Sequence, residues 1–344
     1  MRFLNHKYLS LVVPAALVVA CAAQEPVRPF ESTGRVWPSS PEQARVAYVT
    51  EFSNPADLGI RPSFWNRVMG IAAGPTSQDM IRPMAVAATP DGQIIFVADP
   101  DARCVHRFDR IRSRYDCLVA DSGEALASPI GLAVTPDGKV HVTDSALDLV
   151  FVAGPRDEVL QRLELTPPPD QPTGLALSAS GDLFISSTAS HSVRRYDPAG
   201  RLVREYGGRG DGPGQLNYPT YLWLASPREL LVTDTMNFRI QRFGVDGGVL
   251  GAFGEAGDVT GSLARPKGIA MDRHGHIYVM DGGHHAMQLF DRQGQLLLAV
   301  GEQGQGVGQF WLPSGVFVTA EDLIFVADAY NGRVQVFRYV GDGA

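Results

Sequence analysis

Short apolar runs separated by polar turns follow one another along most of the chain. The clearest copy is 312–337, LPSGVFVTAEDLIFVADAYNGRVQVF. A proline leads into an apolar run, a tight turn follows, and a second run ends at Asp328. Another turn leads into a third run, Arg333–Phe337. Runs rich in Val, Ile and Phe and bounded by Gly, Asp and Asn predict β-strands.

The same pattern occurs six times, and a proline leads each copy. These blade prolines are Pro83, Pro129, Pro172, Pro219, Pro266 and Pro313. Their spacing of 43 to 47 residues predicts an array in which each repeat buries its apolar faces against its neighbours. The repeat from Pro266 to Val300 contains four predicted strands and no useful helix. This excludes helical solenoids and favours four-stranded blades around an axis.

The two ends of the sequence complement each other. The last repeat stops after its third strand and lacks an outer strand. Residues 45–52, RVAYVTEF, alternate in the manner of a strand but precede every repeat. We therefore expect this N-terminal strand to complete the last blade and close the ring, which removes an exposed sheet edge.

Three short motifs recur in phase within the repeats. They are Pro-x-Gly-[Ile/Leu/Val]-Ala, Gly-x-[Ile/Leu]-[Tyr/Phe]-Val-x-Asp and Asn-x-Arg-[Val/Ile]-Gln-x-Phe, with the best copies at Tyr218–Phe243 and Leu312–Phe337. In these motifs the chain resembles the NHL repeat family, over about residues 82–339. The resemblance implies an all-β fold, a six-bladed β-propeller of four-stranded antiparallel blades. It implies no particular activity, because this fold carries unrelated functions.

The N-terminus has the pattern of a processing segment. Arg2 and Lys7 precede an apolar run of 12 residues, Leu9–Ala20, short of the roughly 20 that a membrane-spanning helix needs. The run ends in Val-Val-Ala-Cys, which resembles the lipobox of bacterial lipoproteins. The resemblance implies cleavage before Cys21 and anchoring to membrane lipid through acylated Cys21. A plain signal peptide and a buried cysteine are the alternatives. Ala22 after the cysteine favours the outer membrane of the bacterial cell envelope.

The predicted organisation has three parts. They are a signal peptide at 1–20, a Pro-rich tether at 21–44 and one propeller at 45–344, with blades starting near 83, 129, 172, 219, 266 and 313. Within the third part, residues 63–73 place apolar side chains at helical spacing and predict a short amphipathic helix that caps the core.

Composition narrows the classes of partner. Apolar residues make up 44% of the chain, and its 37 glycines and 24 prolines suit many short strands joined by turns. The net charge is −7, and it becomes −9 when Arg2 and Lys7 are removed with the signal peptide. Such a charge argues against phosphate-rich partners, so we expect no nucleic-acid binding. It also argues against adhesion to anionic lipid through a basic patch.

The other two cysteines lie in adjacent predicted strands of the first repeat. If their hairpin is centred between Arg110 and Ile111, Cys104 and Cys117 face each other directly. In an exported protein this arrangement predicts a disulfide, with two free thiols as the alternative. Neither cysteine belongs to a CxxC pattern, which argues against a metal or catalytic role.

Five aspartates end the second strands of their repeats: Asp99, Asp144, Asp234, Asp281 and Asp328. Because strands alternate in direction, these residues share one rim with the loops that lead into the first strands. We call it the Asp rim. An aspartate here can accept hydrogen bonds from the next turn and pair with the arginine five residues on. We favour this structural role for the five and for Asn237, Arg239, Asn331 and Arg333. A ring of metal ligands is the alternative.

Candidate binding residues are those in which the rim departs from the repeat: His191, Arg209, Asp211, His284, His285 and Tyr330. His191, His284 and His285 are also a weak alternative for a metal site, because catalytic zinc needs three converging ligands. The family's amidating-lyase type implies zinc histidines directly after the blade proline. This chain has Met84, Ile130, Thr173, Thr220, Lys267 and Ser314 there, and no histidine.

Two further features of the rim have a structural interpretation. Arg209-Gly210-Asp211 matches an adhesion tripeptide, but three residues carry little information. Aromatic side chains gather near the starts of two repeats at Tyr221, Trp223, Phe310 and Trp311. We interpret most of them as core between blades; any that reach the rim would anchor a partner.

These patterns favour a lipid-anchored envelope protein that binds another envelope protein or a small ligand through its rim loops. We expect no catalysis and no cofactor. A metal-dependent lyase or hydrolase of the NHL-propeller type is the alternative. RNA binding, as in some animal NHL proteins, is disfavoured by the acidic charge and the export signal.

Overall fold

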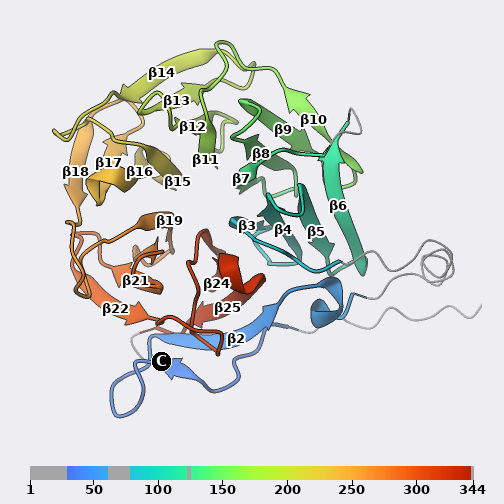
Figure 1. Ribbon diagram of the computed structural model, residues 1–344, viewed down its shortest axis with the longest axis vertical. Coiled ribbons are helices and arrows are strands. Elements are labelled where there is room, and N and C mark those ends of the chain that lie inside the picture. The colour runs from blue at the N-terminus through green and yellow to red at the C-terminus, as the bar shows by residue number, and fades with distance from the viewer. Residues whose placement is uncertain (1–28, 61–77, 122–124, 342–344) are drawn as a thin grey trace, which may run out of the picture.

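Antiparallel β-meanders arranged around a central axis form most of the molecule (Figure 1). The computed structural model describes residues 29–60, 78–121 and 125–341. The all-β prediction and the four-stranded antiparallel repeat are confirmed. The signal peptide, Cys21 and the predicted helix at 63–73 lie outside the described residues. No helix within the described ranges is long and apolar enough to cross a membrane.

The first two meanders share one sheet. Meander 1 consists of β3 (Ala85–Ala88), β4 (Ile94–Asp99), β5 (Cys104–Asp109) and β6 (Arg114–Ala120). Meander 2 consists of β7 (Pro129–Val134), β8 (Val140–Asp144), β9 (Leu149–Ala153) and β10 (Val159–Leu163). The outer strands β6 and β10 pair in parallel over two residues each, which joins the two meanders into an eight-stranded sheet.

The next three meanders are separate four-stranded sheets. Meander 3 consists of β11 (Pro172–Leu177), β12 (Leu183–Ser187), β13 (Ser192–Tyr196) and β14 (Leu202–Gly207). Meander 4 consists of β15 (Pro219–Ser226), β16 (Glu229–Asp234), the short 3₁₀ helix η2 (Thr235–Asn237), β17 (Arg239–Gly244) and β18 (Val249–Phe253). Meander 5 consists of β19 (Pro266–Met271), β20 (Ile277–Asp281), β21 (Ala286–Phe290) and β22 (Leu296–Val300).

The last sheet combines strands from both ends of the described chain. Its order is β1 (Val36–Trp37), β2 (Val46–Phe52), β25 (Arg333–Tyr339), β24 (Leu323–Asp328) and β23 (Val316–Val318). The strand expected at 45–52 is β2, and it pairs antiparallel with β25 from Val46↔Tyr339 to Phe52↔Val334. Figure 1 shows β2 along the outer side of β25. We call this sheet meander 6; it also contains η3 (Ala329–Asn331), and η1 (Pro55–Leu58) follows β2.

The predicted Pro-rich tether differs from the structure in its second half. Phe30 packs edge-on against Phe325 with ring centroids 5.8 Å apart, and Trp37 packs against Phe337 at 5.7 Å. The pairing of β1 with β2 holds Trp37 in place. The tether prediction is therefore wrong for this part, because two aromatic side chains bury against the last sheet and outweigh the proline-rich composition.

The hydrophobic core lies between neighbouring meanders. Six clusters of buried side chains are found among the described residues, and each contains residues of two adjacent meanders. One of them joins meander 6 to meander 1 through Phe325, Val336, Val86 and Phe108. Each meander therefore depends on a neighbour on both sides to bury its apolar faces.

The predicted disulfide between Cys104 and Cys117 is confirmed, with an S–S distance of 2.03 Å. The predicted register is wrong. Cys117 pairs with His106, not with Cys104, so the hairpin is centred one residue later than expected, between Ile111 and Arg112. The cysteines are diagonal neighbours with Cα atoms 5.7 Å apart, within the range that a disulfide spans. Arg112 explains the shift, because its N–H and guanidinium both donate to Asp109 and fix the turn.

Four of the six meanders have glycine two residues after the blade proline, and the neighbouring backbone explains why. A Cβ atom would lie 2.0 Å from the Thr173 carbonyl oxygen at Gly131, and 2.3 Å from that of Thr220 at Gly174. At Gly268 and Gly315 the neighbouring backbone is similarly close. The first strands approach one another around the axis too closely for any side chain to lie between them.

This contact predicts that Gly131→Ala lowers the free energy of unfolding by more than about 2 kcal/mol, because backbone must move to admit the methyl group. Gly248→Ala is the matched control, since only an Asp246 carboxylate oxygen lies near that position, at 3.5 Å. We expect the control to stay within about 0.5 kcal/mol of the wild type in urea unfolding. Equal effects of the two substitutions would show that the close approach is not a constraint.

Candidate functional site

The five aspartates of the Asp rim are buried and hold the backbone of the turns around them. Asp144 accepts hydrogen bonds from the N–H groups of Ala127, Ser128, Ala146 and Leu147 at 2.8 to 3.2 Å. Asp99 and Asp281 accept equivalent sets. These carboxylates tie the loop before the first strand to the turn after the second strand, which is the structural role expected of them.

The remaining two aspartates bind side chains as well. Asp234 Oδ2 accepts from Asn237 Nδ2 and from Arg239 Nε, both at 2.8 Å. Asn331 and Arg333 make the same contacts with Asp328, at 2.8 and 2.9 Å. Arg333 Nη1 also donates to Glu51 Oε2 of β2 at 2.7 Å. In meander 6 these contacts around Asp328 therefore extend to the N-terminal strand β2.

The rim histidines do not converge. His191 Nδ1 accepts from the Tyr218 N–H at 3.2 Å, and His285 Nδ1 accepts from the Leu312 N–H at 3.0 Å. Each of these histidines thus joins its own meander to the following one. Across the described ranges, no three His, Cys, Asp or Glu side chains form a group that could hold a metal ion. The three-histidine metal site is therefore wrong, because His191 and His285 serve two different inter-meander junctions.

The other rim candidates also have local partners. His284 Nδ1 lies 3.2 Å from Asp281 Oδ2. The carbonyl groups of Gly210 and Asp211 accept hydrogen bonds from the side chains of Asn237 and Arg239. The Arg209–Asp211 loop is therefore held by the same two side chains that bind Asp234. Tyr330 is 50% exposed and packs against Trp311, which is 40% exposed, with ring centroids 5.8 Å apart. The structure places Trp311 and Tyr330 together on the surface of the rim.

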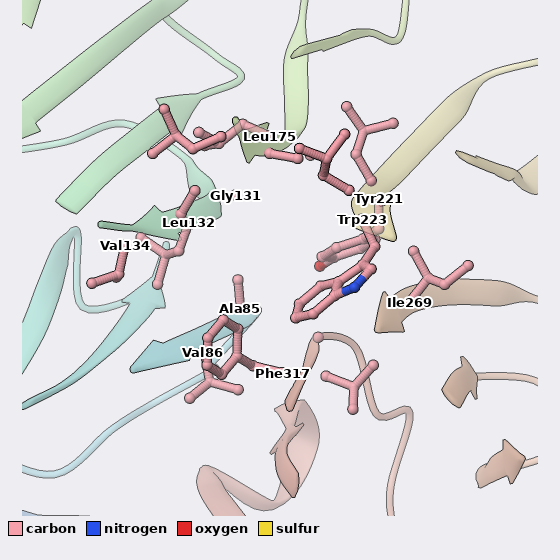
Figure 2. Close-up of a pocket in the computed structure, with 18 residues that line it drawn as sticks. Ala85, Val86, Gly131, Leu132, Val134, Leu175, Tyr221, Trp223, Ile269 and Phe317 are labelled. Carbon is pink, nitrogen blue, oxygen red and sulfur yellow. The ribbon is translucent and has the colours of Figure 1, made fainter. Parts of the chain in front are cut away.

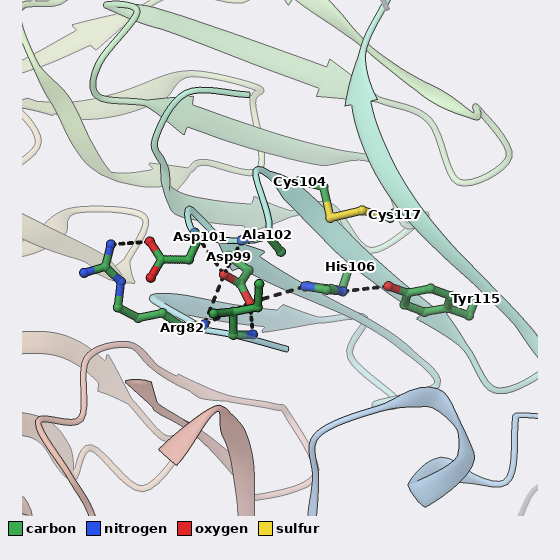
Figure 3. The surroundings of a disulfide bond; sticks show 9 residues. Arg82, Asp99, Asp101, Ala102, Cys104, His106, Tyr115 and Cys117 are labelled. Atoms are coloured by element: carbon green, nitrogen blue, oxygen red, sulfur yellow. Dashed lines mark hydrogen bonds and ion pairs between the residues drawn. A yellow bond between two sulfur atoms is a disulfide. The ribbon is translucent and has the colours of Figure 1, made fainter. Parts of the chain in front are cut away.

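A buried polar chain lies beside the disulfide (Figure 3). His106 Nδ1 lies 2.8 Å from the Tyr115 hydroxyl, and its Nε2 lies 3.4 Å from Asp99 Oδ2. Burial alone would raise the pKa of Asp99, but the hydrogen bonds from His106 and from the N–H groups of Ala102 and Ile81 lower it. The pKa of Tyr115 is raised to about 12, first by burial and then by Asp99. None of these three residues lines the axial cavity described below, and we assign the chain a structural role.

A cavity of about 200 Å³ lies on the central axis. The first strands line it, and all its lining side chains are apolar except the hydroxyl of Tyr221 and the indole N–H of Trp223. Figure 2 shows Tyr221 and Trp223 pointing from β15 into the centre, with Phe317 on the far wall. It reaches Val134 and Leu177, the last residues of their strands, and so extends away from the blade prolines.

Tyr221 closes the end of this cavity that faces the Asp rim. Its hydroxyl group lies 2.8 Å from the Met84 carbonyl oxygen, to which it donates, and 2.7 Å from Ser314 Oγ. A side chain of meander 4 thus crosses the axis to meanders 1 and 6. Burial raises the pKa of Tyr221 to about 12, so the phenol remains a neutral donor at physiological pH.

Trp223 and Phe317 form an aromatic pair in the wall, with ring centroids 5.6 Å apart and planes at 67°. The indole N–H of Trp223 has no hydrogen-bond partner within the described ranges. Among the lining side chains the indole N–H is the free donor, so the cavity is suited to a small, largely apolar molecule that carries an acceptor.

The repeat itself carried a signal for this site that composition did not. Tyr221 stands at the position where four meanders have glycine, and Trp223 and Phe317 stand where the other four have alanine. A bulky side chain cannot lie between first strands that approach so closely, so it must project into the axis. The expectation that Tyr221 and Trp223 belong to the core between blades holds in part, because both pack against the cluster between meanders 4 and 5 and both also line the cavity.

A family model of the NHL repeat matches residues 263–290 and 310–337, in meanders 5 and 6. The protein is an NHL-type β-propeller. A search of curated proteins found no match to this NHL propeller.

Solved structures share the fold of this NHL propeller at low sequence identity. Virginiamycin B lyase from Staphylococcus aureus is 15% identical with a TM-score of 0.56, over 75% of this chain and 95% of the lyase. An auxiliary nutrient binding protein from Bacteroides thetaiotaomicron is 13% identical with a TM-score of 0.59, over 77% of this chain and 71% of that protein. Hydrazine synthase from Kuenenia stuttgartiensis is 15% identical with a TM-score of 0.55, over 77% and 97%.

We expect one histidine of this NHL propeller to make the free energy of unfolding depend on pH. His141 of β8 is buried, and its Nδ1 has no hydrogen-bond partner among the residues that the structure describes. Burial, followed by the charge of Lys139, lowers the pKa of His141 to about 4. The unfolded chain binds this proton near its ordinary pKa of about 6.5. The stabilising contribution is therefore complete above pH ~6.5 and is lost as the pH falls towards 4.

We expect His141→Leu to lose about 2 kcal/mol less stability than the wild type between pH 7 and pH 4.5, because leucine takes up no proton on unfolding. Urea unfolding at the two pH values measures the difference. The assignment fails if both proteins lose the same free energy over this range.

Proposed function

We propose that this protein is a lipid-anchored envelope propeller that binds a small, largely apolar molecule in its axial cavity without transforming it. In this proposal the six meanders are the blades of one closed ring, and β2 completes the last blade. The six hydrophobic clusters, each between adjacent meanders, support a closed ring. The pairing of β2 with β25 supports closure by the N-terminal strand.

The observation that carries the binding role is the set of departures from the repeat around the axis. Tyr221, Trp223 and Phe317 replace the small residues of the other meanders, and all three line the same cavity. A propeller stabilised only by its repeats does not need aromatic side chains at these positions. Their placement in a single enclosure supports recognition of a ligand there.

The size and chemistry of the cavity define the ligand class. A dry cavity of about 150 Å³ is known to hold benzene, so one of about 200 Å³ has room for a single ring with a small substituent. The Tyr221 hydroxyl already donates to Met84 O. Among the lining side chains the indole N–H of Trp223 is therefore the donor left for the ligand, and we assign it to one carbonyl or ether oxygen.

The absence of catalysis remains a proposal and has two supports. The described residues place no cluster of titratable side chains in the cavity lining. One structure of similar fold is that of an auxiliary nutrient binding protein, which fits a binding role. Virginiamycin B lyase has a similar fold and represents the alternative of an enzyme.

A second candidate function is an envelope protein partner at the Asp rim. Large apolar side chains are exposed there on two meanders: Tyr218 and Met236 on one, Trp311 and Tyr330 on the other. Exposed aromatic residues are common anchors of protein interfaces. Crosslinking in intact membranes tests this candidate, and repeated recovery of the protein with no stable neighbour would oppose it.

Acetophenone and cumene form a matched pair of probes for the axial cavity. Both carry one benzene ring and a substituent of similar size, but only acetophenone has an acceptor oxygen. We expect wild-type protein to bind acetophenone several-fold more tightly than cumene, since one hydrogen bond to an otherwise unpaired donor contributes about 1 kcal/mol. Titration calorimetry measures both affinities.

The Trp223→Phe variant keeps an aromatic wall and removes the donor, so it should lose the preference for acetophenone. Trp311→Phe, on the rim, is the control and should keep it. The proposal is contradicted if neither probe binds the wild type with a Kd below about 1 mM. It is also contradicted if the two variants lose the preference equally.

The lipid anchor is tested separately. Cys21→Ser removes the thiol that acylation requires, so the full-length precursor should move from the membrane fraction to the soluble fraction of expressing bacteria. Labelling with radioactive palmitate should disappear at the same time. A variant that stays with the membrane and keeps the label would rule out the anchor at Cys21.

A further inference from the structure

Lysine is rare in this chain, which uses arginine for nearly all its cations. Only Lys7, Lys139 and Lys267 occur among the 30 basic residues. Lys267 follows the blade proline of meander 5, in a set of six equivalent positions of which the other five are uncharged. These positions surround the axis at the Asp-rim end, where Tyr221 bonds to Met84 and Ser314. One lysine therefore stands at the Asp-rim end of the axis.

The backbone and the stem of Lys267 are held in place. The Lys267 carbonyl oxygen accepts from Thr233 Oγ1 of β16 at 2.8 Å. Its Cε lies 3.7 Å from the position that a Cβ would take at Gly282, so the stem packs over a turn that has no side chain. The residue as a whole is half-buried. The ammonium group thus has a defined location with access to solvent.

The ammonium group has no counterion. Within the described ranges, the Lys267 side chain has neither a hydrogen bond nor an ion pair. The charges that act on it are Arg265 and Arg82, which are cations. The nearby carboxylates are occupied: Asp101 pairs with Arg82 at 2.5 Å, and Asp281 accepts from the N–H groups of Ala264 and Arg265.

This arrangement is unusual for an acidic protein. Burial first, and then the two arginines, lower the pKa of Lys267 to about 8. A half-buried cation beside two further cations destabilises the free protein unless an anion joins it. The repeat does not require a cation at this position, because the five equivalent positions carry uncharged side chains.

We propose that Lys267 is the centre of a carboxylate-binding site on the Asp rim, beside the central axis and outside the end that Tyr221 closes. The single unpaired ammonium matches one negative charge, whereas Arg82 is engaged with Asp101. The remainder of the ligand would be apolar, because the surface next to Lys267 exposes an apolar side chain. The η2 turn, whose Met236 is 51% exposed, packs against meander 5 through the hydrogen bond from Thr235 to the Pro266 carbonyl. The ligand class is an aryl or acyl carboxylate.

This site is distinct from the axial cavity, because the Tyr221 side chain lies between them. The two can be tested independently. Loss of acetophenone binding in Trp223→Phe leaves the lysine site intact, and loss of carboxylate binding leaves the cavity intact.

The probe is 2-naphthoate, with uncharged 2-naphthamide as its isostere and inorganic phosphate as a competitor. Wild-type protein should bind 2-naphthoate at pH 7 at least tenfold more tightly than 2-naphthamide. Lys267→Gln should bind the two probes equally. Lys139→Gln, which removes an exposed lysine in meander 2, should behave as the wild type. Thermal unfolding of each variant confirms that the fold is retained.

A pH series provides a readout that a purely structural lysine would not change. Affinity for 2-naphthoate should fall as the pH rises through about 8, because Lys267 then loses its proton. The charged groups that act on Lys267 are Arg265 and Arg82. Trace acetylation with mass spectrometry should show Lys267 protected by 2-naphthoate and Lys139 unprotected.

Three outcomes would overturn the proposal. The first is equal binding of 2-naphthoate by the wild type and Lys267→Gln, or no saturable binding by the wild type. The second is an affinity that does not change between pH 7 and 9.5. The third is displacement of 2-naphthoate by an equal concentration of inorganic phosphate, which would make the site a general oxyanion site.

Discussion

The structure depends on one constraint: no meander can bury its two faces alone. Each hydrophobic cluster is shared between adjacent meanders, so every interface needs the next one, and an open array would leave two apolar faces in water. Strands from both ends of the described chain meet in the last sheet. β2 pairs with β25 along its whole length, and the Arg333–Glu51 ion pair at 2.7 Å joins the same strands. The strands β2 and β25 are thereby part of one sheet.

The same close packing produces the functional features. First strands that approach to backbone contact leave room only for glycine and alanine, so any larger residue at those positions must enter the axis. Tyr221, Trp223 and Phe317 do so. Tyr221 closes one end of the cavity, and Trp223 and Phe317 form an aromatic pair in its wall. Lys267 is the corresponding departure among the residues that follow the blade prolines. We propose that the regular repeat supplies stability and that these departures from it supply the binding sites.

Most of the fold could be predicted because its signals are local. Strand runs, blade prolines and the Asp-Asn-Arg turns are written within each repeat, and the turns bond as expected, with Arg239 on Asp234. Features that depend on neighbouring backbone could not be predicted in the same way. The hairpin register at Cys104 and Cys117 is set by the Arg112–Asp109 contacts. The packing of Phe30 and Trp37 depends on a sheet almost 300 residues away in sequence.

Ring closure is tested most directly by deleting residues 45–52 and following thermal unfolding by calorimetry. A closed ring predicts that the deletion lowers the Tm by more than ten degrees or abolishes the cooperative transition. It would expose β25, and it would uncover Phe337 and Phe108, because Tyr48 and Phe52, which pack against them, are removed with the strand. A truncated protein with the Tm and cooperativity of the wild type would contradict this account.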